Sequence, residues 1–171
     1  MSIGLWVRGA RPKTLVTSIA SVMVGAVMAY VHIERSGTCI AIYPEPASCA
    51  TAREQQTLLM DRFWPVTILC LLVALFLQIA VNYANDYSDG IRGTDAGRDM
   101  DESKSGKPQR LTASGLVPAK HVLFAAMICA AIACICGVVA VVLAQAWWLL
   151  AVGAASLLAG WFYTGGKHPY G

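Results

Sequence analysis

Charged residues are scarce in this sequence. Only 13% of the 171 residues are Asp, Glu, Lys or Arg, whereas 57% are hydrophobic. A soluble domain carries about 25% charged residues and about 45–50% apolar ones. The shortage of charge therefore argues against a soluble enzyme or binding module and predicts that the chain lies in a lipid bilayer. No nucleic-acid-binding module or internal repeat is visible.

Histidine is also rare, and the cysteines form no framework. The three histidines have no Cys/His spacing of metal type, which argues against a zinc site. Cysteines inside apolar runs are predicted to be core thiols, namely Cys70, Cys129, Cys134 and Cys136. Cys39 and Cys49 flank a Pro-containing loop. They can pair only if that loop faces an oxidising compartment, so both states stay open.

Long apolar runs are abundant. Four are long enough to cross a bilayer core, which takes about 20 residues; they are Thr14–Ile33, Phe63–Ala84, Val117–Leu143 and Trp147–Thr164. Tryptophans near the ends of these runs, Trp6 among them, are expected to be interfacial anchors. We therefore predict an all-α membrane protein, a multi-helix transmembrane bundle that forms one domain over residues 1–171.

Lysine and arginine lie mostly on one side of these runs. Ten of the 13 lie in the N-terminal flank, the segment from Tyr87 to Lys120 and the tail, whereas the predicted loop Glu34–Arg62 has three. The positive-inside rule then predicts that both termini and the loop 87–116 are cytoplasmic. A basic loop that faces anionic lipid is one interpretation, and a phosphorylated substrate is the other.

A polar stripe ends the second apolar run. At about 100° per residue, one arc of about 100° holds Gln78, Asn82, Asn85, Asp86 and Asp89. Such a face must look into the bundle or into a water-filled cavity. Gly90 and Gly93 give the chain a place to turn back, so Asp95 could rejoin Asp89.

Clustered acids at this position indicate a cation. The C-terminal end of a helix disfavours carboxylates, and the acids repel one another. A divalent ion reverses both effects, and Mg²⁺ binds through carboxylates plus substrate phosphates. Lys107 and Arg110 could then donate to phosphate oxygens. The alternative is a solvated helix end, with the acids paired to Arg92 or Arg98.

Four motifs occur in order along the chain. They are Arg11-Pro-Lys-Thr-Leu15, Asn85-Asp86-Tyr87-Ser88-Asp89 with Gly93 and Asp95, Arg110-Leu-Thr-Ala-Ser-Gly-Leu116, and Tyr163-Thr-Gly-Gly166. Together they resemble the UbiA superfamily of intramembrane prenyltransferases, and most closely its branch that acts on 1,4-dihydroxy-2-naphthoate. The resemblance implies a helical bundle with a central cavity in a bacterial plasma membrane.

The resemblance also implies a reaction. Mg²⁺ would bind a polyprenyl diphosphate, whose ionisation gives an allylic cation that the ring of 1,4-dihydroxy-2-naphthoate captures with decarboxylation, giving demethylmenaquinol. The metal–diphosphate motif would be Asn85, Asp86, Asp89 and Asp95, with the three acids as catalytic groups. Substrate contacts would come from Asn82, Asn85, Lys107, Arg110, Arg11, Lys13 and Tyr163.

Three departures from this pattern stand out. Gly93 occupies a position where the wider superfamily has an acid, which favours the naphthoate branch. Ala113 replaces a frequent glutamine. A second Asp-rich motif is missing, so the chain is expected to be the N-terminal half of an enzyme, inactive without the C-terminal half.

Other functions stay open. A prenyltransferase with another aromatic acceptor would share every motif, and a membrane cation transporter could use the polar stripe as an ion path. The basic loop argues against transport. The signature of CDP-alcohol phosphotransferases begins like Asp86-x-x-Asp89-Gly90, but the later acids have the wrong spacing.

The expected half-length leads to a first prediction. Intact-mass measurement of the product of the native locus should give about 30 kDa or more, as an eight- or nine-helix bundle requires at about 20 residues per helix. A product of 18.2 kDa would contradict it.

Overall fold

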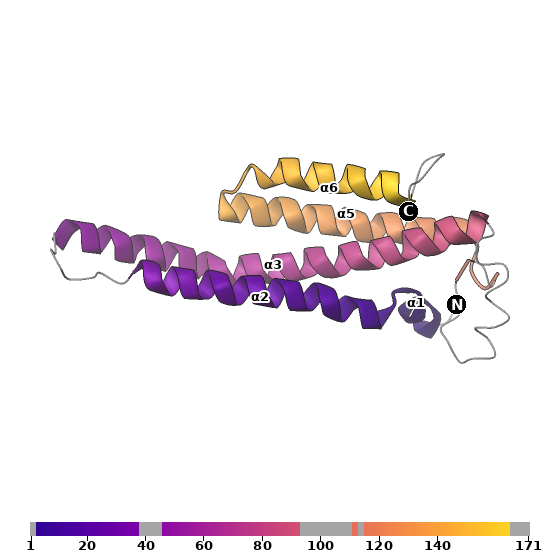
Figure 1. The fold of residues 1–171 in the computed structure, drawn as a ribbon, viewed down its shortest axis with the longest axis horizontal. Coiled ribbons are helices and arrows are strands. Elements are labelled where there is room, and N and C mark those ends of the chain that lie inside the picture. The colour runs from indigo at the N-terminus through magenta and orange to yellow at the C-terminus, as the bar shows by residue number, and fades with distance from the viewer. Residues whose placement is uncertain (1–2, 38–45, 93–110, 113–114, 165–171) are drawn as a thin grey trace.

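The computed structural model describes residues 3–37, 46–92, 111–112 and 115–164, and these described parts are almost entirely helical, without a strand. The helices are α1 (Ile3–Gly9), α2 (Pro12–Ser36), α3 (Pro46–Arg92), α5 (Ala119–Ala144) and α6 (Leu149–Thr164). The four longer helices run side by side along one axis (Figure 1). The all-α prediction is confirmed.

Three helices are long and apolar enough to cross a membrane: α2, the part of α3 from Cys49 to Arg92, and α5. In α6 the apolar stretch Leu149–Gly160 is shorter. Many large apolar side chains on the outside of these helices are exposed, as the hydrocarbon of a bilayer allows. The set agrees with a multi-helix transmembrane bundle.

The third helix is much longer than the predicted span. It has 47 residues, which is about 70 Å at 1.5 Å per residue and more than twice a bilayer core of about 30 Å. The predicted loop Glu34–Arg62 is therefore helical from Pro46 onward, a start that suits the fixed φ of proline. Charged side chains, including Arg53 and Glu54, suit this part to water, and it projects past α5 and α6 (Figure 1).

The other end of α3 also extends beyond the predicted limit. A loop was expected from Tyr87, with Gly90 and Gly93 as the place to turn back, but the helix continues through Gly90 to Arg92. Gly93 lies outside the described residues. One glycine in a helix costs only about 1 kcal/mol, and the packing of Tyr87 and Ser88 offsets it, since Ser88 is buried and Tyr87 lies against the core. Asn85 and Asp89 are consequently held on a continuous helix.

The helices alternate in direction, so the described parts of the four motifs lie at one end (Figure 1). The N-terminal helix, the end of α3, the start of α5 and the end of α6 lie together (Figure 1). At the opposite end, Arg62 Nη1 donates to the carbonyl oxygen of Leu143 at 3.2 Å and joins α3 to the end of α5.

A small buried cluster lies at the motif-bearing end. It is here called the elbow core, because it includes Ala10 at the turn between α1 and α2. Its members are Ala10, Tyr83, Leu111, Val117, Val122 and Ala126. Trp6 packs edge-on against Tyr83, with ring centroids 5.6 Å apart, and the Tyr83 hydroxyl donates to the Trp6 carbonyl at 2.9 Å. Trp6, expected as an interfacial anchor, packs α1 onto α3.

Cys70, Cys129, Cys134 and Cys136 are free thiols, but they are not all in the core as expected. Cys134 is exposed and the other three are half-buried, because the apolar outer faces of these helices are not covered by protein. Cys49, near the start of α3, is disulfide-bonded. The predicted partner, Cys39, lies outside the described residues.

Gly9 provides a test of the elbow core. A methyl group at this position would overlap the buried Leu111 side chain and come within 3.1 Å of the Tyr83 ring. Gly9→Ala should lower the free energy of unfolding by about 1–3 kcal/mol, measured by thermal unfolding in detergent. In the control Gly25→Ala, the new methyl group meets nothing within 4 Å. Equal stability of the two variants would refute the close packing.

Candidate functional site

The chain changes direction between α1 and α2 at the elbow, residues 10–14. Arg11 has φ 53° and ψ 70°, a left-handed conformation that costs about 1–2 kcal/mol for a residue with a Cβ. Pro12 disfavours the right-handed helical region for Arg11, which explains why α1 does not continue into α2 but does not by itself favour the left-handed conformation. The backbone N–H and the hydroxyl of Thr14 both donate to the Arg11 carbonyl, each at 2.9 Å.

The polar stripe of α3 holds this elbow. Asn82 is only 3% exposed. Its Nδ2 donates to the Ala10 carbonyl at 2.8 Å and to Thr14 Oγ1 at 3.0 Å. Because a carbonyl can only accept, the amide nitrogen and not the oxygen must face Ala10. Asn82 thus hydrogen-bonds to the backbone of Ala10 on one side of Arg11 and to the side chain of Thr14 on the other.

A second polar contact lies one turn deeper along the same two helices. Ser18 Oγ donates to Gln78 Oε1 at 3.1 Å, and Gln78 Nε2 donates to Asn82 Oδ1 at 3.4 Å. Polar groups between apolar helices are costly unless they are hydrogen-bonded, so these pairs fix the register of α2 against α3. Asn82, expected to contact substrate, makes its hydrogen bonds to the protein.

Asn85 and Asp89 complete the stripe toward the helix end. They lie one turn apart on the same face of α3, and both are half-buried. The elbow is therefore fixed one turn before Asn85 and two turns before Asp89. The first two motifs of the sequence, far apart in the chain, meet at this end of the bundle.

Asp86 lies in the interior instead. It is 3% exposed, and its Oδ2 accepts the backbone N–H of Leu111 at 2.8 Å. The carbonyl of Leu111 accepts the N–H of Val117 at 3.2 Å. Leu111 is fully buried and also fills the space beside Gly9. Asp86 therefore joins α3 to the segment that leads into α5. This segment begins at Leu111, the residue after Arg110.

The other predicted site residues are either outside the described part of the chain or exposed. Asp95, Lys107 and Arg110 lie outside the described residues. Lys13 is exposed on the first turn of α2, and Tyr163 is 48% exposed on α6. Within the described ranges, no three His, Cys, Asp or Glu side chains come together as a metal site would need.

The donor chemistry of the helix end suits a hard cation in part. Mg²⁺ takes oxygen ligands and is bound through one or two carboxylates plus substrate phosphates. Asp89 and Asn85 offer such oxygens on one accessible face. Asp86, buried and hydrogen-bonded to Leu111, fits the role of a structural anchor better.

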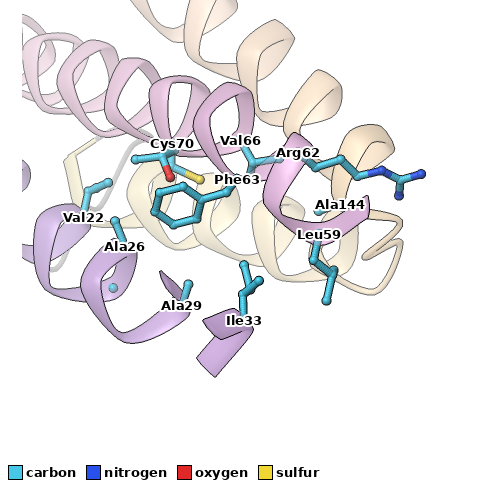
Figure 2. Close-up of a pocket in the computed structure, with 12 residues that line it drawn as sticks. Val22, Ala26, Ala29, Ile33, Leu59, Arg62, Phe63, Val66, Cys70 and Ala144 are labelled. Atoms are coloured by element: carbon cyan, nitrogen blue, oxygen red, sulfur yellow. The ribbon is translucent and has the colours of Figure 1, made fainter. Parts of the chain in front are cut away.

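An apolar cavity of about 420 Å³ lies elsewhere, between α2 and α3. Figure 2 shows its lining, which includes Ala26, Phe63 and Cys70, with the Arg62 guanidinium directed away from it. Cys70 is 16 residues before Asp86, about 24 Å along the helix. This cavity is therefore separate from the acidic helix end.

Comparison with known proteins identifies the family. Residues 57–170 match the UbiA prenyltransferase family, and the match includes the acidic end of α3. The chain belongs to the UbiA prenyltransferase family. No solved structure matches the chain.

Three relatives of this UbiA chain are each named 1,4-dihydroxy-2-naphthoate octaprenyltransferase. The protein of Mycobacterium tuberculosis is 40% identical over 170 residues, that of Mycobacterium leprae 36% over 170 residues, and that of Escherichia coli 28% over 177 residues. The matches cover 97–99% of this chain but only 45–46% of each relative. The chain therefore spans about half the length of these relatives.

Asn82 was expected at the site, and Thr14 and Leu111 lie within the first and third motifs, but the sequence did not indicate that these residues hold the elbow and Asp86 in place. Gly9 gave no signal, because its role depends on the space that Leu111 fills.

The role of Asp86 can be tested by truncation. Asp86→Ala leaves the buried Leu111 N–H without its carboxylate acceptor and should lower the unfolding free energy by about 1–3 kcal/mol. Asp89→Ala, at a half-buried position, should be milder. Denaturant unfolding in micelles measures both, and a wild-type midpoint for Asp86→Ala would contradict the anchoring role.

Proposed function

We propose that the protein containing this chain transfers a polyprenyl group from a polyprenyl diphosphate to 1,4-dihydroxy-2-naphthoate, with Mg²⁺ and with loss of the carboxylate. The observation that carries the proposal is the meeting of the first two motifs at one end of the bundle. Asn82 ties the elbow to α3, and Asn85 and Asp89 follow on the same face. Family membership and the names of the relatives support the reaction class.

The reaction requires charge neutralisation at the leaving group. Asn85 and Asp89, with Asp95 beyond the described part, would hold Mg²⁺, which would supply positive charge to the diphosphate oxygens. Arg11, Lys13, Lys107 and Arg110 would add donors to those oxygens. The allylic C–O bond then breaks, and the ring carbon bearing the carboxylate attacks the cation. Carbon dioxide and pyrophosphate leave, and demethylmenaquinol remains.

The apolar surroundings suit this chemistry. An allylic cation reacts with water, so a dry site protects it. The elbow core excludes water on one side of the acidic face through Tyr83, Leu111 and Val117. Another aromatic acceptor would need the same elements, so the acceptor is the least constrained part of the proposal.

The contacts of the polar stripe favour an enzyme over a cation transporter. A transport path needs polar groups that face an open passage. Gln78 and Asn82 are instead engaged with Ser18, Ala10 and Thr14 across the α2–α3 interface.

We place the acidic end on the cytoplasmic side of a bacterial plasma membrane. Two features support this orientation. Ten of 13 basic residues belong to that side. The disulfide-bonded Cys49 lies at the opposite end of α3, and disulfides persist in oxidising compartments.

The central test replaces one acid. Asp89→Asn in the full-length protein should lower prenyl transfer by about 100-fold or more. A neutral amide lacks the negative charge with which Asp89 would hold Mg²⁺ at the helix end. The assay supplies membranes with a polyprenyl diphosphate, 1,4-dihydroxy-2-naphthoate and Mg²⁺, and quantifies prenylated product and released carbon dioxide.

The matched control is Asp61→Asn, an exposed acid at the far end of the apolar part of the same helix. It should retain wild-type turnover, and EDTA should abolish turnover in both it and wild type. Near-wild-type activity of Asp89→Asn would refute the metal assignment. Product that keeps its carboxylate would refute the decarboxylating reaction.

A further inference from the structure

We infer that Asn82 is a positioning residue for Arg11, and that it acts on the diphosphate end of the substrate through the elbow. The inference rests on the proposed function, because it takes Arg11 as a contact of the polyprenyl diphosphate. In this role Asn82 acts through the protein and not through a direct contact with substrate. Its hydrogen bonds go to Ala10, Thr14 and Gln78.

The conformation of Arg11 is the first observation. Its left-handed backbone is unfavourable for a residue with a Cβ and persists only when its surroundings determine it. The neighbouring contacts do so from both sides. Asn82 fixes the carbonyl that precedes Arg11, and Thr14 binds the carbonyl of Arg11 itself with both its N–H and its hydroxyl.

The donor pattern around Thr14 is the second observation. Its hydroxyl has a single hydrogen, which it donates to the Arg11 carbonyl, and its lone pairs accept from Asn82 Nδ2. The three groups therefore form one directed chain from Asn82 through Thr14 to Arg11. Removal of the amide breaks this chain and the bond to Ala10 together.

Burial makes these bonds strong. Asn82 is 3% exposed and Ala10 is buried, so removal of the amide takes away a buried hydrogen bond at a position with little access to solvent. The Ala10 carbonyl would stay unsatisfied unless the elbow moved. Movement of the elbow displaces Arg11 relative to Asn85 and Asp89, which remain on the rigid α3.

The test is a double-mutant cycle in the full-length protein. Arg11→Ala and Asn82→Ala should each raise KM for the polyprenyl diphosphate about tenfold with little change in kcat, the size expected for one charge-assisted hydrogen bond. In the Arg11→Ala background, Asn82→Ala should change KM by less than about twofold. Additive effects, or an unchanged KM in Arg11→Ala, would overturn the inference.

Two further variants separate positioning from general stability. Ser18→Ala removes the neighbouring contact to Gln78 but leaves the elbow bonds, so its KM should equal that of wild type. Thr14→Val keeps the side-chain shape and the backbone N–H bond to Arg11 but removes the hydroxyl that joins Asn82 to the Arg11 carbonyl, so its KM should rise. If Asn82→Ala does not fold, the Thr14→Val variant still tests the inference. An equal rise in Ser18→Ala and Thr14→Val would overturn the assignment.

Amide hydrogen exchange gives a readout that needs no substrate. Peptides that cover residues 6–16 should exchange about tenfold faster in Asn82→Ala than in wild type, and at the wild-type rate in Ser18→Ala. If the wild-type protein transfers no prenyl group, the proposed function fails, and with it the link to substrate. The exchange result then decides separately whether Asn82 holds the elbow, and unchanged exchange would overturn that as well.

Discussion

Hydrogen bonding along one face of α3 determines how the motif-bearing end of the bundle is built. The helix runs between apolar neighbours, where an unsatisfied amide or carboxylate is costly. Gln78, Asn82 and Asp86 therefore each require partners, and three separate segments provide them: α2, the elbow and Leu111. The cost of leaving these groups unpaired is what brings the distant motifs of the chain together.

This requirement divides the polar stripe into two functional parts. The deeper residues, together with Asp86, serve the protein itself by fixing the register of helices and the path of the chain before α5. Asn85 and Asp89, nearer the helix end and half-buried, stay accessible to a ligand. A stripe that looks uniform in sequence thus combines a structural part with a candidate reactive part.

Much of the architecture could be predicted from the sequence, because apolar runs of membrane length leave few alternatives to helices. The limits of α2, α5 and α6 fall within two or three residues of the predicted spans. The extent of α3 could not be predicted in the same way. Its polar first third has no apolar pattern, and Gly90 is a breaker that packing overrides. The identity of the acidic motif was readable from residue types, whereas the role of Asp86 depends on a backbone N–H 25 positions later. Backbone donors leave no trace in residue type, so such a contact is invisible to sequence patterns.

The exposure of α6 has a consequence for how the protein assembles. Every side chain of α6 whose burial the structure describes is exposed, whereas α3 packs extensively against both α2 and α5. Helix association in a membrane depends on packing between helices, so α6 is held to the rest of the bundle less firmly than α2, α3 and α5 are held to one another. The final position of α6 is then governed less by these three helices than by lipid or by further protein packed against its outer face.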